Sequence, residues 1–201
     1  MQKHQIITLD GTMGRLSIGS RTQASRHKRN FDAIITIEDP GTKFHQRVRF
    51  HSNPHPEQLV LTFEDLDEPN EYIHAETYHV EQVLEFSNRY LSSDLLIHCV
   101  AGRCRSTAMA YAVICDRYGP GREKEALSML LSITPDAVPT KLIVALADDL
   151  MGRQGIMLNT VEEYVANEPS ALRLRSLKAK LLDPNEKGYN PYLFARKPIA
   201  D

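Results

Sequence analysis

A cysteine, an arginine and a serine are spaced so that they could carry phosphate chemistry. Cys99 is followed after five residues by Arg105 and Ser106. Residues 95–97 form a short apolar run typical of a buried strand, and residues 107–118 have a helical pattern. A strand, a tight loop and a helix N-terminus in succession direct backbone N–H groups and the positive end of a helix dipole toward an anion. The segment therefore predicts an anion-binding loop.

Each residue type has a role in such a loop. Arg105 offers a planar guanidinium that can hold two phosphate oxygens with two parallel hydrogen bonds. Cys99 stands at the entrance of the loop, where the positive field favours the thiolate, the nucleophilic form of the side chain. The residues between them would bind phosphate through their backbone: Val100, Ala101, Gly102, Arg103 and Cys104. The alternative is a buried core cysteine near an exposed arginine, which needs neither a turn nor a basic loop.

The stretch from His98 to Ser106 resembles the signature loop of the cysteine-dependent protein tyrosine phosphatases, most closely their compact dual-specificity branch. The resemblance implies that Cys99 attacks phosphorus to form a phosphocysteine, while Arg105 clamps the phosphate. Ser106 would steady the departing thiolate, and His98 would orient the loop and tune the nucleophile. Gly102 stands where the loop needs a residue that tolerates positive φ. The family uses neither metal nor cofactor, so none is expected.

A proton donor is expected in the acidic segment that follows residues 59–63. Cleavage of a phosphoester at neutral pH benefits from a positioned carboxylic acid, whose carboxylate can afterwards activate water. In the family this acid lies on a loop well before the cysteine; Asp65 and Asp67 stand 34 and 32 residues before Cys99. Asp65 resembles the family pattern better, because it comes two residues after the apolar Phe63. Asp67 is the alternative acid, and a merely solvated acidic loop is the plainer interpretation.

Cys104 departs from the dual-specificity pattern. The low-molecular-weight tyrosine phosphatases carry a second cysteine at the corresponding place, and the family's pair can close a reversible disulfide. A regulatory bond between Cys99 and Cys104 is therefore one interpretation. A small residue that fills a crowded position is the other. A thiol-based arsenate reductase, with Cys104 as the resolving thiol, is a further alternative.

The centre of the loop bears on the substrate. Ala101, Gly102 and Arg103 are similar to the centre of the phosphoinositide-type members, but Val100 is neutral, so there is one extra base rather than two. Phosphotyrosine-containing protein is the expected substrate, with tyrosine-only or dual specificity left open. A phosphoinositide or another polyanionic phosphoester is the second choice. A catalytically silent phosphate-binding module is the alternative outside the enzymes.

The composition of the chain argues against several other classes of protein. The chain has 201 residues, 42% of them hydrophobic, and 24 basic against 26 acidic residues give a net charge of −2. This balance gives no support to nucleic-acid binding. No apolar run has the length of a membrane span or a signal peptide, and three cysteines, an odd number, argue against a disulfide framework. We expect a cytoplasmic protein without a transmembrane segment.

Hydrophobic periodicity predicts an α/β fold with a central, mostly parallel sheet flanked by helices. Strands are expected at residues 5–9, 15–18, 33–37, 44–55, 59–63 and 95–98. Helices are expected at residues 20–29, 73–91, 107–118, 122–131, 139–151, 157–165 and 171–182. The site would lie at the carboxyl end of the strand before Cys99, where open α/β sheets bind ligands.

The phosphatase resemblance covers residues 15–152, which is well short of the whole chain. We assign residues 1–168 to the phosphatase catalytic domain and residues 169–201 to a C-terminal helix and an extended tail. The proline-containing tail could dock on its own domain or on a partner protein.

Overall fold

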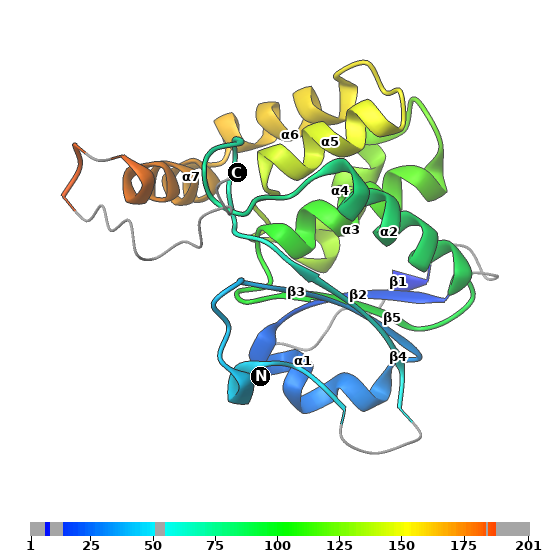
Figure 1. The fold of residues 1–201 in the computed structure, drawn as a ribbon. Coiled ribbons are helices and arrows are strands. Elements are labelled where there is room, and N and C mark those ends of the chain that lie inside the picture. Colours follow the sequence, from blue (N-terminus) through cyan, green and yellow to red (C-terminus); the bar gives the residue numbers. More distant parts are fainter. Residues whose placement is uncertain (1–6, 9–13, 51–54, 184, 188–201) are drawn as a thin grey trace.

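A five-stranded sheet runs through the middle of the molecule (Figure 1). The computed structural model describes residues 7–8, 14–50, 55–183 and 185–187. The strands are β1 (Ile7–Thr8), β2 (Arg15–Ser20), β3 (Ala33–Glu38), β4 (Glu57–Thr62) and β5 (Leu95–Cys99), in the order β1-β2-β5-β3-β4. Only the pair β1 and β2 is antiparallel, and the other three neighbouring pairs are parallel. The expected α/β fold with a mostly parallel sheet is confirmed.

Helices cover both faces of this sheet. The short helix α1 (Arg21–His27) lies on one face, and five helices lie on the other (Figure 1). These five are α2 (Thr77–Arg89), α3 (Arg105–Tyr118), α4 (Glu123–Ile133), α5 (Lys141–Leu150) and α6 (Ile156–Asn167). The last described helix, α7 (Pro169–Leu182), follows α6 directly and packs against it. The division after residue 168 stays a prediction, because α7 is in contact with the part of the chain before it.

Strand β5 and helix α3 form the centre of the fold. All five residues of β5 are buried, and Ile97 pairs with Ile18 on one side and with Ile35 on the other. Eleven of the fourteen residues of α3 are buried, which is the pattern of a helix surrounded by other elements. The chain segment that connects these two elements is thus held by the most buried parts of the protein.

The strand expected over residues 44–55 is wrong. Residues Phe44–Gln46 form a short 3-10 helix, residues 47–50 have no regular structure, and 51–54 lie outside the described residues. Val48 is buried in a small second core, but its carbonyl accepts from the Gln58 side chain at 2.8 Å. A side chain therefore satisfies the backbone group that a neighbouring strand would otherwise pair. The alternation of apolar and charged residues in this segment indicates which side chains are buried, but it does not show that the backbone pairs with another strand.

Other expectations fall partly outside the described residues. Of the strand expected at residues 5–9, the structure describes β1 (Ile7–Thr8) alone. Of the expected tail, it describes residue 183 and residues 185–187. The possible docking of the tail on a partner therefore stays a prediction. None of the described helices is both long enough and apolar enough to cross a membrane.

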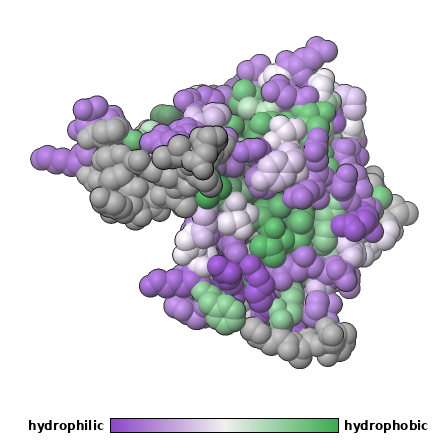
Figure 2. Space-filling view, in the orientation of Figure 1, coloured by the Kyte–Doolittle hydropathy of each residue, from purple (hydrophilic) through white to green (hydrophobic). Residues whose placement is uncertain are grey.

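The visible surface in Figure 2 is mostly hydrophilic, with a hydrophobic patch at the level of the sheet, below α2. In the same orientation, β4 crosses the front of the molecule as the edge strand of the sheet (Figure 1). Leu59 and Val60 of this strand are only partly buried. The patch is consistent with a sheet edge that helices do not fully cover.

A buried ion pair joins α4 to the segment between α5 and α6 and secures α3. Arg153 Nη1 lies 3.0 Å from Glu123 Oε1, and the two side chains are 7% and 2% exposed. Arg153 Nη2 donates to the carbonyl of Cys115 in α3 at 3.0 Å. Removing one partner of a buried pair leaves the other charge without compensation.

We expect Arg153→Met to lower the free energy of unfolding by about 3–5 kcal/mol, because Glu123 is left charged in the interior. Urea denaturation followed by circular dichroism measures this loss. Arg122→Ala is the matched control, since its pair with Glu125 is more than half exposed on both sides. That change should lower the free energy of unfolding by less than about 1 kcal/mol. Equal losses in the two variants would contradict the prediction.

Candidate active site

Residues 99–105, which we call the signature loop, connect β5 to α3. Cys99 is the last residue of β5, and Arg105 is the first residue of α3. The backbone N–H groups of Ala101, Arg103 and Cys104 donate to no backbone carbonyl within the described part of the chain. These groups lie at the N-terminus of a fourteen-residue helix, where the helix dipole is positive. The loop has the local structure that a phosphate group requires.

The sulfur of Cys99 is surrounded by hydrogen-bond donors. Its Sγ lies 3.2 Å from the Oγ of Ser106 and 3.2 Å from the backbone nitrogen of Gly102. Cys99 is 3% exposed and is not part of a disulfide. Donors at this distance stabilise a thiolate and, later, a sulfur leaving group. The structure thus brings Cys99 and Ser106 together as the sequence predicted, and Gly102 joins them through its backbone.

Gly102 has the backbone conformation that was expected of it. Its φ is +78°, in the left-handed region that favours glycine. A Cβ atom at this position would lie 2.7 Å from the carbonyl carbon of Gly19 and 2.7 Å from the nitrogen of Ser20. Both atoms belong to the backbone, so neither can move aside as a flexible side chain would. The loop can pass this close to β2 only with glycine at position 102.

We expect Gly102→Ala to lower kcat/KM for a small aryl phosphate by at least roughly 100-fold, because the loop amides are displaced from the phosphate. The alanine variant should also lose about 1 kcal/mol or more of stability. Gly41→Ala is the matched control, because nothing lies within 4 Å of a Cβ atom at that position. Steady-state kinetics and urea denaturation measure both effects. Wild-type activity in Gly102→Ala would show that the loop geometry is not required.

Arg105 is positioned by contacts with two segments, those that directly follow β3 and β4. Its Nη1 donates to the carbonyl of Phe63 at 2.6 Å, and its Nη2 lies 2.6 Å from Asp39 Oδ1. The residue is only 3% exposed, and its Nε has no hydrogen-bond partner among the described residues. Burial disfavours the positive charge, but the neighbouring Cys99 and two carboxylates outweigh it and raise the pKa of Arg105. A buried guanidinium with an unused Nε is a donor that a phosphate oxygen can satisfy.

His98, which directly precedes the signature loop, has a hydrogen-bond partner at each ring nitrogen. Its Nε2 lies 2.9 Å from the Thr36 hydroxyl, which also accepts from the Gln58 side chain at 2.7 Å. Its Nδ1 lies 3.5 Å from the carbonyl of Cys99. Burial lowers the pKa of His98 to about 4, so the imidazole is neutral at physiological pH. The neutral imidazole contacts Cys99 through its backbone carbonyl and brings no positive charge to the loop.

The acidic segment after β4, residues 64–68, which we call the acid loop, lies above the signature loop. Asp65 Oδ1 accepts from the Thr140 hydroxyl at 2.7 Å and from Lys178 Nζ at 3.0 Å. Asp67 has both of its carboxylate oxygens engaged, one by the backbone nitrogen of Lys141 at 2.8 Å and the other by Lys178 at 3.2 Å. Lys178 therefore bridges the two candidate acids.

Asp65 is the acid that faces the signature loop. Arg105 lies close enough to lower the pKa of Asp65, and this carboxylate adds to burial in raising the pKa of the Cys104 thiol. Burial alone would raise the pKa of Asp65. The charges of Lys178 and Arg105, together with the hydrogen bonds on Oδ1, overcome that effect and hold the pKa below its ordinary value. The preference for Asp65 over Asp67 as the proton donor stays a prediction.

Two loop residues have neighbours that the sequence did not indicate. The Arg103 side chain lies 2.9 Å from Asp136 Oδ2 and donates to the Asp136 carbonyl at 3.1 Å, so its charge is already paired. Cys104 is 5% exposed and unpaired with another cysteine. Burial, with a further contribution from Asp65, raises the pKa of the Cys104 thiol. A redox role for Cys104 stays a prediction.

Three residues of the site were not identified from the sequence. Asp39 follows β3 directly, and the parallel strands β3 and β5 end at the same edge of the sheet. The position of Asp39 just after an expected strand was a signal that could have identified it as a site residue. Thr140 and Lys178 lie 75 and 113 residues from Asp65, and no local pattern connects them to it.

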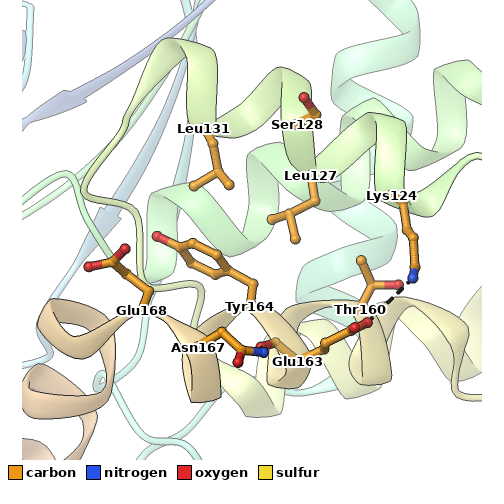
Figure 3. A pocket seen from close by; sticks show the side chains of 9 residues that line it. All are labelled: Lys124, Leu127, Ser128, Leu131, Thr160, Glu163, Tyr164, Asn167 and Glu168. Atoms are coloured by element: carbon orange, nitrogen blue, oxygen red, sulfur yellow. Dashed lines mark hydrogen bonds and ion pairs between the residues drawn. The ribbon is translucent and has the colours of Figure 1, made fainter.

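A separate pocket of about 430 Å³ lies between α4 and α6 (Figure 3). Leu127, Leu131 and Tyr164 contribute apolar surface, and an ion pair of 3.4 Å between Lys124 and Glu163 crosses one end. The lining includes neither cysteine nor histidine. Within the ranges that the structure describes, no cluster of three metal-ligating side chains is present either. The signature loop is therefore the site with recognisable chemistry.

Comparison with solved structures identifies the fold. Over 76% of this chain and 99% of the other, the structure superposes on the active form of Tk-PTP with a TM-score of 0.54 and 19% identity. PTPMT1 in complex with PI(5)P matches 76% of this chain and 93% of its own length, with a TM-score of 0.50 and 16% identity. Human tyrosine phosphatase-like serine/threonine/tyrosine-interacting protein matches 75% and 97%, with a TM-score of 0.53 and 15% identity. The chain has the fold of dual-specificity-like tyrosine phosphatases.

Sequence comparisons contribute nothing further. No family model matches the chain, and no curated protein is significantly similar to it in sequence. The residues of the site therefore have to carry the functional argument.

Proposed function

We propose that this protein is a cysteine-dependent phosphatase that hydrolyses phosphate monoesters through a phosphocysteine, without metal or cofactor. One observation carries the proposal: Cys99 Sγ lies within 3.2 Å of two donors at the N-terminus of α3. Arg105, buried beside it, has an unpartnered Nε. A structural cysteine would need none of these groups, whereas a phosphate-bound nucleophile needs all of them.

In the first step the Cys99 thiolate attacks phosphorus and the bond to the leaving oxygen breaks. Arg105 and the loop amides hold the three non-bridging oxygens, on which negative charge is concentrated. Asp65 gives its proton to the leaving oxygen, so an alcohol or phenol departs. The product of this step is a phosphocysteine and an ionised Asp65.

In the second step water attacks the phosphocysteine and Asp65 takes the proton from that water. The S–P bond breaks, and the electron pair returns to Cys99 as a thiolate. Ser106, at 3.2 Å from the sulfur, stabilises this leaving thiolate with a hydrogen bond. The cycle ends with inorganic phosphate and regenerated protein.

A bound phosphate changes the state of the acid. In the structure, Asp65 is held ionised by Lys178 and Arg105, because their positive charges favour the carboxylate. A phosphate dianion on Arg105 would neutralise part of that field and add repulsion, which favours protonation of Asp65. The substrate itself thus helps to protonate the group that donates to its leaving oxygen.

Phosphotyrosine-containing protein is the proposed substrate class. A phosphoinositide is the competing class, supported by the structural similarity to PTPMT1, whose solved complex contains PI(5)P. The pairing of Arg103 with Asp136 weighs against it, because the extra base is not available without breaking an ion pair. A phosphate-binding module without turnover is the third possibility, and a thiol-dependent arsenate reductase is the fourth.

The test is hydrolysis of a small aryl phosphate in excess chelator, followed by a phosphotyrosyl peptide and phosphoinositide vesicles. We expect metal-independent turnover of the aryl phosphate and faster turnover of the peptide than of the lipid. Preference for the lipid would change the substrate class but keep the mechanism. Thiol-dependent turnover of arsenate would indicate the reductase. A folded protein that binds phosphopeptide without hydrolysing any of these compounds would overturn the proposal in favour of the binding module.

A further inference from the structure

The C-terminal helix α7 presents one face to the rest of the protein. Ala171, Leu174, Arg175 and Lys178 are spaced by three, one and three residues, so they lie on the same side of the helix. Ala171 is completely buried and Leu174 packs against the main core. Arg175 pairs with Glu162 of α6 and donates to the carbonyl of Pro139 at 3.1 Å. These contacts determine where Lys178, one turn further along, must lie.

Lys178 reaches from this face to the acid loop. Its Nζ lies 3.0 Å from Asp65 Oδ1 and 3.2 Å from Asp67 Oδ2, and its side chain is only 14% exposed. Figure 1 shows the chain after β4 rising past the helices to the beginning of α7. One lysine therefore holds two carboxylates of a segment that is more than 100 residues away in the sequence.

We propose that Lys178 is a positioning residue for the proton donor, so that helix α7 holds Asp65 in place above the signature loop. The inference rests on the proposed function and deepens it, because it assigns a catalytic task to a helix outside the region of phosphatase resemblance. Lys178 itself does not touch the phosphate. It acts through the placement and the charge of Asp65.

An ordinary surface ion pair would contribute little, since exposed pairs are screened and flexible. The arrangement here differs in two respects. The lysine is largely buried, and it separates two carboxylates that would otherwise repel each other across the acid loop. Loss of the ammonium group leaves those two negative charges without their shared counterion, so the repulsion moves the loop or favours protonation of one carboxylate.

Several charged groups face Asp65, and they set the sign of the effect. Lys178 from α7 and Arg105 from α3 lower the pKa of Asp65. The Cys104 thiol, just before α3, faces this carboxylate, and Asp67 shares Lys178 with it. Burial lowers the pKa of Lys178, but the same carboxylates outweigh it and raise that pKa above its ordinary value, so the lysine is charged throughout the physiological range. Removing Lys178 therefore raises the pKa of Asp65.

A general acid must be protonated, so activity is lost as pH rises through the pKa of Asp65. We expect Lys178→Met to move the basic limb of the kcat/KM profile to higher pH. Below that limb, kcat/KM for an aryl phosphate with a poor leaving group should fall roughly tenfold, because the acid is no longer held in place. Lys178→Arg should restore most of the rate and the position of the limb. If Lys178 contributed to stability alone, its replacement would leave the basic limb of the kcat/KM profile at the same pH.

The experiment uses the full chain and two readouts. The first is the pH dependence of kcat/KM for wild type, Lys178→Met, Lys178→Gln and Lys178→Arg. The second is nuclear magnetic resonance of chains labelled with carbon-13 at the aspartate carboxyl, in which Asp65→Asn assigns the Asp65 signal. Lys180→Met is the matched control, because Lys180 is an exposed lysine on the same helix. Amide hydrogen exchange of residues 64–68 reports the mobility of the acid loop.

The proposal is supported if Lys178→Met and Lys178→Gln raise the midpoint of the Asp65 titration and speed exchange of the acid loop, whereas Lys180→Met changes neither. An Asp65 titration that is the same in wild type and both variants overturns it. If the wild type shows no turnover, the proposed function fails by itself. The titration and exchange data then still decide whether Lys178 holds the acid loop.

Discussion

Replacing Cys99 by serine should abolish phosphatase activity while leaving the fold intact. We expect kcat to fall by at least roughly 10³-fold, because a hydroxyl is a far weaker nucleophile than a thiolate, and an alkoxide is a poorer leaving group than a thiolate in the second step. The change removes no buried volume of consequence, and Ser106 and the Gly102 amide can still bond the new oxygen. Hydrolysis of an aryl phosphate in excess chelator measures the loss.

Cys115→Ala provides the matched control for Cys99→Ser. Cys115 is also buried in the core, but it lies within α3, away from the signature loop, and burial raises its pKa to about 12. The control should keep wild-type kcat even if it is somewhat less stable. Circular dichroism and urea denaturation verify that both variants are folded. Turnover by Cys99→Ser within tenfold of wild type would show that the sulfur is not the nucleophile.

Replacing Asp65 by asparagine should lower kcat by about 100-fold or more for substrates with poor leaving groups. Asparagine keeps the shape of the carboxylate and can still accept from Thr140, which donates to Oδ1 at 2.7 Å. It cannot give a proton to the leaving oxygen. The loss should therefore grow as the pKa of the leaving phenol rises, and it should be smallest for an activated aryl phosphate. A series of aryl phosphates measures this dependence.

Asp67→Asn distinguishes the two candidate acids. Both carboxylate oxygens of Asp67 are engaged by Lys141 and Lys178, so its neutralisation should disturb the loop but not remove the proton donor. We expect a loss of less than about tenfold that does not depend on the leaving group. The basic limb of the pH profile should disappear in Asp65→Asn and remain in Asp67→Asn. The opposite pattern would make Asp67 the acid and would contradict the assignment.

Much of the site could be predicted because its central part is local in the sequence. Cys99, Gly102, Arg105 and Ser106 stand within eight residues, and a strand, a tight turn and a helix N-terminus leave few ways of arranging them. The positive φ of Gly102 followed from the same turn and is confirmed. The mostly parallel sheet was equally accessible, since strands that alternate with helices along the chain favour parallel pairing.

The local sequence pattern gave a wrong secondary structure where side chains from distant parts of the sequence bind the backbone. The alternation around Val48 and Arg49 predicted a strand. In the structure, the Gln58 side chain donates a hydrogen bond to the Val48 carbonyl, and Glu38 forms an ion pair with the Arg49 guanidinium. Both partners belong to other elements. An alternating pattern shows which side chains are buried, but not whether a neighbouring strand is free to pair.

The sequence by itself indicated the proposed nucleophile Cys99, its loop and two candidate acids. Only the tertiary structure decided how they are held: Arg105 by Asp39 and the carbonyl of Phe63, and Asp65 by Thr140 and Lys178. The reason is that the chemistry of a phosphate-binding loop is set by neighbours along the chain, which a motif records. The orientation of a guanidinium and the charge of a carboxylate are set by neighbours in space, brought there by the packing of the sheet and of α7.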